Sequence, residues 1–192
     1  MFRVGQGWLI YEITGNPWSL GLVGAANAIP AIFLNLFGGV FADRLDKRRL
    51  IIFTQLTTGS LIFLLATLTL VGAVESWHVL VVALLAGGVE AFDNPARQAL
   101  YPHLIDRKVM MSAVAMNSVI WQGTRIVAPG IAGVLIDLIN TESALYISGM
   151  GFVLLAVVMA RLKVPPIPRG ARGNPVHDIK EGLKFIKVNS IF

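Results

Sequence analysis

Three charged residues, Glu90, Asp93 and Arg97, interrupt an apolar stretch of this 192-residue chain and could do chemistry in nonpolar surroundings. Their i, i+3 and i+7 spacing predicts that they share one face of a helix. Charges inside apolar helices are unfavourable and usually face a bundle interior or a water-filled cavity. The triad therefore indicates either a gate, substrate contact or proton relay, or a structural ion-pair network. Its depth in the span favours Glu90 as a pathway residue, whereas Asp93 and Arg97 look more structural. Pro95 lies between them and predicts a kink.

Arg125 is a further charge deep inside an apolar run, and it must find a partner there. Glu90, Asp93 or Asp137 could pair with it. A guanidinium also suits carboxylate or catecholate ligands, so a substrate contact is the alternative to a structural pair.

Two asparagines and a Pro-Gly pair add polar and bending positions to other apolar runs. Asn27 and Asn35 are eight residues apart and therefore lie on roughly one helix face. They are expected either to line a cavity or to form hydrogen bonds between helices. Pro129 and Gly130 predict a bend and a close approach of neighbouring helices.

A short basic segment separates two long runs, 13–42 and 50–74, that contain no charge at all. Its four cations and two carboxylates predict a short loop between two membrane-spanning helices. The Asp43 carboxylate could accept charge-assisted bonds and act as a latch at the membrane edge. The alternative is a loop whose solvated charges only set the topology. The candidate gating residues of this segment are Gly39, Asp43, Arg44, Arg48 and Arg49.

The elements that position these residues are predicted to be membrane-spanning helices. The chain is 55% hydrophobic and 14% charged, with a mean hydropathy of +0.71, whereas soluble domains carry about 25% charged residues. A span needs roughly 20 apolar residues. The expected spans are 20–41, 50–71, 79–100, 111–136 and 144–160, preceded by a short apolar stretch at 4–13. That first stretch is either a tilted partial span or, as we expect, a helix that lacks its beginning.

The cations are distributed on one side of the predicted topology. Segments 44–49, 103–108 and 161–187 hold thirteen Lys and Arg residues, and the alternate turns hold none. By the positive-inside rule, the basic loops and the C-terminal tail are cytoplasmic.

The composition changes after the sixth span. Residues 163–175 are rich in Pro, Gly and Arg, and 176–191 alternate apolar and charged positions as an amphipathic surface helix does. A soluble helix or the lead-in to another span are the alternatives. We therefore divide the chain into a transmembrane bundle, 1–162, and a cytoplasmic linker, 163–192.

Other function classes find no support in the residues. The chain has no cysteine and three scattered histidines, which gives no metal-ligand spacing, and it has no phosphate-binding loop or nucleophilic triad. We expect no enzyme activity, cofactor or metal, and no nucleic-acid partner, because topology explains the basic residues.

The basic segment also carries a resemblance. Gly39-x-x-x-Asp43-Arg44-x-x-x-Arg48-Arg49 resembles the loop signature of the major facilitator superfamily, with Asp46 where a second glycine usually stands. The pattern is similar to a bacterial branch that contains enterobactin-type siderophore exporters and macrolide efflux pumps. Stretches 6–15, 93–99 and 117–130 look like the same branch.

This resemblance implies an all-α integral membrane fold, the amino-terminal six-helix bundle of a major facilitator, with its first helix truncated. It implies secondary active efflux of a siderophore- or drug-like small molecule, coupled to protons, across a bacterial cytoplasmic (inner) membrane. The expected partners are the substrate, protons, the lipid bilayer and a missing carboxy-terminal six-helix half. The alternative is a truncated half-transporter that acts only as a membrane scaffold or is inactive.

Overall fold

The structure is a computed structural model that describes the backbone of residues 2–104 and 107–162. Side chains are described for the same residues except 36–44, 102–104 and 107. The expected linker and amphipathic helix, 163–192, lie outside the described residues. The helices are α1 (Phe2–Thr14), α2 (Trp18–Arg44), α3 (Lys47–Leu70), α4 (Ser76–Leu104), the 3₁₀ turn η1 (Arg107–Val109), α5 (Met110–Leu138) and α6 (Thr141–Arg161).

The described part of the chain is all α-helical, as predicted, and five of its helices are long and apolar enough to cross a membrane. They are α2 to α6. Four of the expected spans lie within one of them, and 50–71 extends one residue past the end of α3 at Leu70. The 13-residue α1 covers about 20 Å at 1.5 Å per residue, which is less than the hydrocarbon thickness of roughly 30 Å.

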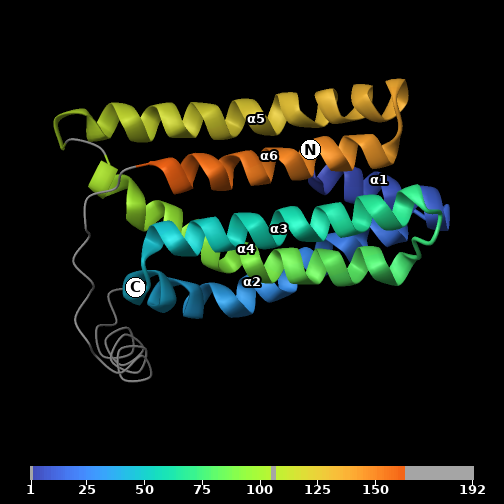
Figure 1. Cartoon of the computed structure of the whole chain (residues 1–192), viewed down its shortest axis with the longest axis horizontal. Coiled ribbons are helices and arrows are strands. Elements are labelled where there is room, and N and C mark those ends of the chain that lie inside the picture. The colour runs from blue at the N-terminus through green and yellow to red at the C-terminus, as the bar shows by residue number, and fades with distance from the viewer. Residues whose placement is uncertain (1, 105–106, 163–192) are drawn as a thin grey trace, which may run out of the picture.

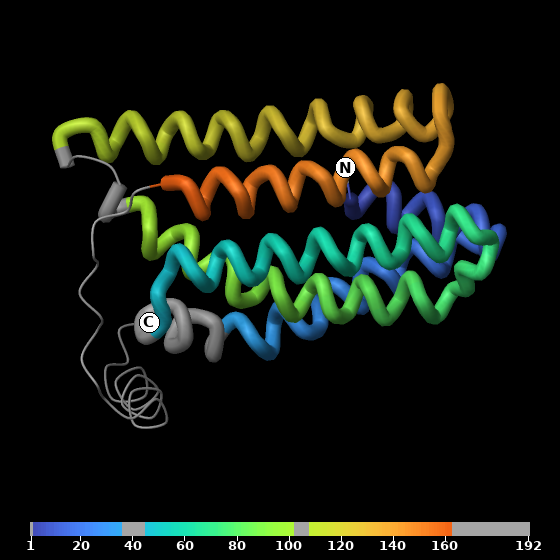
Figure 2. The backbone as a smooth tube through the Cα atoms, viewed as in Figure 1, coloured from blue at the N-terminus to red at the C-terminus, as the bar shows by residue number. Residues whose placement is uncertain are grey.

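The helices lie side by side along one axis of the bundle (Figure 1). α3 lies between α4 and α6, and α2 packs mainly against α4. α5 lies at the edge next to α6 and makes few contacts with the rest of the bundle (Figure 2). The ends of α2, α4 and α6 meet at one end of the bundle, whereas the α1–α2, α3–α4 and α5–α6 turns meet at the other. The three basic segments thus begin at the same end.

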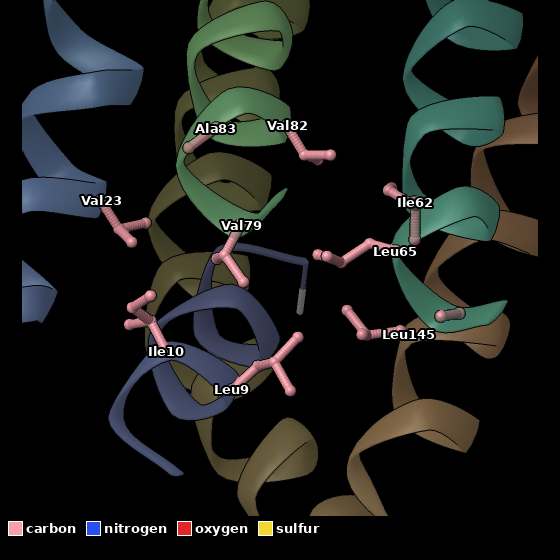
Figure 3. Packing of buried hydrophobic residues seen from close by; sticks show 10 residues of the cluster. Leu9, Ile10, Val23, Ile62, Leu65, Val79, Val82, Ala83 and Leu145 are labelled. Atoms are coloured by element: carbon pink, nitrogen blue, oxygen red, sulfur yellow. The ribbon is translucent and has the colours of Figure 1, made fainter. Parts of the chain in front are cut away.

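One buried apolar cluster joins five of the helices (Figure 3). Leu9 and Ile10 of α1 meet Val79 of α4, and Leu65 of α3 lies near Leu145 of α6. Because lipid tails are as apolar as these side chains, close packing rather than the hydrophobic effect holds such an interface together.

Gly87 brings α2 and α4 into backbone contact. A Cβ atom at this position would lie 2.1 Å from the carbonyl oxygen of Asn27, closer than any real contact. Only glycine permits this approach, which fixes the spacing of the two helices around Glu90 and Asn27.

The predicted loop between the second and third spans was too long. α2 continues through Arg44 and α3 begins at Lys47, so only Leu45 and Asp46 connect them. Asp46 sets the boundary: its backbone is extended, and its side chain caps α3 by accepting a hydrogen bond from the Arg49 backbone N–H at 3.2 Å. Gly39, Asp43 and Arg44 therefore lie in the last turns of α2 rather than in a loop.

Candidate functional site

A cavity of about 300 Å³ lies between α1, α2 and α4. Small residues of α2, among them Gly24, Ala28 and Ala31, leave room for it. Its polar lining consists of Arg3, Asn27, Asn35, Glu90 and Asn94.

An ion pair between Arg3 and Glu90 crosses this cavity and joins α1 to α4. Arg3 Nη2 donates to Glu90 Oε2, and the two side chains remain 63% and 40% exposed. Glu90 stands at the middle of the 29-residue α4, about 21 Å from either helix end at 1.5 Å per residue. Charges at this depth are typical of a pathway or binding site.

The two asparagines of α2 both lie on the cavity wall. Asn27 is buried, and its Nδ2 donates to the carbonyl oxygen of Val23 in the same helix at 2.9 Å. Asn35 is exposed. Asn94, which the sequence did not single out as a site residue, adds a third amide from α4.

A second polar cluster joins α4 to α3 rather than to the cavity. Arg97 Nε donates to Asp93 Oδ2 at 2.6 Å, and the two side chains are 22% and 15% exposed. Asp93 Oδ1 accepts from Thr54 Oγ1 at 2.6 Å and from Gln55 Nε2 at 2.9 Å. The carboxylate is therefore shared by one cation and two neutral donors, which is the arrangement of a structural network.

Glu90 and the Asp93–Arg97 pair lie in different surroundings, although their spacing predicts a shared side of α4. Glu90 turns toward α1 and α2, whereas Asp93 and Arg97 are engaged with each other, Asp93 also with α3. Three residues advance a helix by about 300°, and the remaining 60° is enough to move a side chain from one interhelical groove into the next. α4 also continues as one helix through Pro95.

Arg125 is exposed on α5 and makes no ion pair or hydrogen bond with any residue whose side chain the structure describes. Two of its expected partners, Glu90 and Asp93, are engaged elsewhere. A Cβ atom at Gly130 would meet nothing within 4 Å. The close helix approach predicted there, next to Pro129, is thus absent from the described part of the bundle.

The five candidate gating residues at the α2–α3 link fall into three groups. Arg48 Nε donates to the Met159 carbonyl at 2.8 Å and its Nη2 to the Ala160 carbonyl, so Arg48 caps the C-terminus of α6. Arg49 is largely exposed, with its Nε 3.8 Å from Asp46 Oδ2. The side chains of Asp43 and Arg44, together with Gly39, lie outside the described side chains, and their gating role stays a prediction.

The sequence reading missed Arg3 as a site residue. The signal was available: α1 is too short to span the bilayer, so a charge at its start lies beside the bundle interior rather than in water. Thr54 and Gln55 were also missed, although polar side chains inside an apolar run indicate a polar partner on a neighbouring helix, here Asp93.

A second cavity, of about 600 Å³, lies between α1, α5 and α6 beside the α5–α6 turn. Its lining includes Glu12, Asp137 and Glu142, and Thr141 Oγ1 donates to Glu12 Oε2 at 3.1 Å. Among the described residues, no group of three acidic, histidine or cysteine side chains is arranged to hold a metal ion.

Comparison with known proteins places the whole chain in one group. The family described as "transmembrane secretion effector" matches residues 1–191. The staphyloferrin A transporter of Staphylococcus aureus is 27% identical over 88% of this chain and 43% of its own length. The multidrug efflux pump Tap of Mycolicibacterium fortuitum is 26% identical over 93% of this chain and 46% of its own length. The macrolide efflux protein A of Streptococcus pyogenes is 20% identical over 93% and 45%.

The chain thus spans a little under half the length of these curated relatives. No solved structure matches it significantly.

Proposed function

Because this chain belongs to the transmembrane secretion effector family of the major facilitator superfamily, we propose that it is the amino-terminal half of a secondary transporter that exports a small molecule. The observation that carries this proposal is the Arg3–Glu90 pair, which places two charges in a cavity beside the middle of α4. Charged side chains within membrane-spanning helices usually face a water-filled cavity and mark a functional pathway.

Export would proceed by rocking of this bundle against a carboxy-terminal six-helix half, which would supply the second wall of the cavity. The names of the relatives are those of a staphyloferrin A transporter, a multidrug efflux pump and a macrolide efflux protein. We therefore place the substrate among siderophore- or drug-like molecules.

Proton coupling is the finer part of the proposal. Glu90 is the only carboxylate among the described residues that line the cavity, and its partner Arg3 is the only cation there. A carboxylate that can exchange a guanidinium for a proton is suited to link substrate movement to a proton gradient. Arg125, exposed on α5, is a further candidate contact for the substrate or for the second half.

A transport assay tests this function. The protein made from its complete gene is reconstituted into proteoliposomes, and movement of staphyloferrin A, erythromycin and ethidium is measured with and without a pH gradient. We expect gradient-driven movement of at least one compound, and we expect Glu90→Gln to abolish it.

Glu75→Gln is the matched control, because Glu75 lies in the α3–α4 turn and accepts a hydrogen bond from Trp77 Nε1 that a glutamine oxygen can also accept. Movement that ignores the gradient would overturn the proton coupling. Immobility of all three compounds would count against export itself.

The five apolar helices and the transporter relatives make the chain a multi-pass membrane protein. We propose that the basic end of the bundle is cytoplasmic in a bacterial inner membrane, and that 163–192 form a cytoplasmic linker. The chain has no cysteine, so Ala73→Cys and Leu162→Cys give clean labels. An impermeant maleimide should label position 73 on intact cells and position 162 only after permeabilisation, and the reverse pattern would invert the topology.

The gating proposal rests on Asp43 at the end of α2. Asp43→Asn should leave membrane insertion intact and change the transport rate, because the neutral amide weakens charge-assisted bonds to a partner helix. An unchanged rate in the complete protein would remove the latch role.

A further inference from the structure

The guanidinium of Arg3 lines the cavity and does not take part in a buried hydrogen-bond network. Its side chain is 63% exposed, whereas that of Arg97 is 22% exposed and committed to Asp93. The only partner that the structure gives to Arg3 is the carboxylate of Glu90, on the same cavity wall. A carboxylate thus already occupies the Arg3 guanidinium.

The remaining lining suits an organic acid. A guanidinium binds carboxylates through two parallel N–H donors, which a lysine cannot do. Asn27, Asn35 and Asn94 supply neutral donors and acceptors, and the α2 surface near Ile32 is apolar. At about 300 Å³, the space is at the lower end of ligand pockets, which run from roughly 300 to 1,000 Å³.

We propose that Arg3 binds the carboxylate of an anionic substrate and that Glu90 takes the substrate's place between transport events. The inference rests on the proposed function, since it assumes that this cavity is the transport site. Glu90 would then act as an internal competitor, and a substrate must displace it from Arg3 to bind.

Displacement also defines the charge balance of the site. With the substrate carboxylate on Arg3, Glu90 loses its cationic partner, and the site carries one net negative charge because a single guanidinium then faces two carboxylates. No covalent bond forms or breaks between protein and substrate. Among the described residues, no other titratable group lines the cavity, and the neighbouring Asp93 is held by Arg97 and α3.

The test uses two probes of one shape and different charge, 4-fluorobenzoate and 4-fluorobenzamide. Their binding to the complete protein in nanodiscs is measured by ¹⁹F NMR. An exposed ion pair contributes up to about 1 kcal/mol, so Glu90→Gln should tighten benzoate binding about fivefold. Arg3→Gln should weaken it at least about tenfold, because hydrogen bonds to charged groups are worth roughly 1.5–3 kcal/mol.

Matched controls separate these effects from a change in net charge. Glu75→Gln and Arg161→Gln alter charges outside the cavity and should leave both dissociation constants within about twofold of the unsubstituted protein. Benzamide binding should be unaffected by either cavity substitution. If Arg3→Gln does not elute as a folded protein, Arg3→Lys replaces it and should still weaken benzoate binding, since the fork is lost.

The outcomes distinguish this inference from the proposed function. If benzamide binds but benzoate does not, even to the Glu90→Gln protein, the cavity remains a ligand site and the carboxylate assignment fails. Benzoate binding that is indifferent to Arg3 also overturns the assignment. If neither probe binds any variant, both the assignment and the role of this cavity in transport are overturned.

Discussion

Gly87→Ala should separate α2 from α4 at the cavity. The added Cβ atom would lie 2.1 Å from the carbonyl oxygen, 2.8 Å from the carbonyl carbon and 3.0 Å from the Cα atom of Asn27. These are backbone atoms of a helix, which cannot rotate out of the way as the tip of a long side chain can. The relief must therefore come from movement of the whole helix.

The size of the effect follows from these distances. Ordinary contact begins at 3.4 Å, so the carbonyl oxygen of Asn27 must move away by about 1.3 Å. A gap of 0.5–1 Å between two atoms already removes roughly a quarter to a half of their dispersion energy, so this movement weakens the neighbouring contacts between α2 and α4. Overpacking of a close-packed interface costs about 1–3 kcal/mol. We expect about 3 kcal/mol here, because backbone presses on backbone.

The free energy of unfolding is measured by SDS titration in mixed micelles, followed by tryptophan fluorescence. Gly88→Ala is the matched control on the neighbouring residue. Its Cβ atom would lie 3.5 Å from Leu34 Cδ1, an ordinary contact, so its unfolding free energy should stay within about 0.5 kcal/mol of the unsubstituted protein or rise slightly, since alanine favours a helix. Equal stability of the two alanine variants would refute the backbone contact between α2 and α4.

Substitutions at three further positions test the other contacts. Asp93→Ala removes the acceptor of Arg97 and should lower the unfolding free energy by about 3 kcal/mol. The unfolding free energy of Asp93→Asn should lie between those of Asp93→Ala and the unsubstituted protein, and an unchanged SDS midpoint for Asp93→Ala would contradict the network. Arg48→Ala should cost about 1 kcal/mol and speed hydrogen exchange of the last-turn amides near Ala160, which mass spectrometry detects; unchanged exchange would argue against the cap. Arg125→Gln, on exposed α5, should change the unfolding free energy by less than about 0.5 kcal/mol, and a larger loss would reveal a partner within the chain.

The helices were predictable from sequence because charges interrupt the apolar runs so sharply. Each expected span matches an observed helix to within one residue of its limits, and the short first helix was also expected. The link between α2 and α3 was misjudged, since a charge marks where water begins and not where a helix ends. The end is set by Asp46, whose capping bond is a local geometric event that hydropathy does not report.

The polar site was predictable in content and not in pairing. Spacing along α4 identified Glu90, Asp93 and Arg97, and Asp93 and Arg97 do pair within that helix. The other partners come from α1 and α3, and Arg3 is 87 residues away from Glu90 in sequence. Pairing at such a separation depends on the packing of whole helices. For Arg125 the sequence predicted a partner inside the bundle, and none of the described side chains supplies one, because α5 lies at the edge of the bundle.

The link between α2 and α3 has a mechanical consequence. Two residues offer almost no slack, so a rotation of the basic end of α2 passes directly to α3. Arg48, in the first turn of α3, donates hydrogen bonds to the Met159 and Ala160 carbonyl oxygens and therefore transmits the same motion to α6. The basic ends of α2, α3 and α6 are thus coupled, although α6 is far from the other two in the chain. Two glycines inserted after Leu45 should uncouple α2 from α3 and α6.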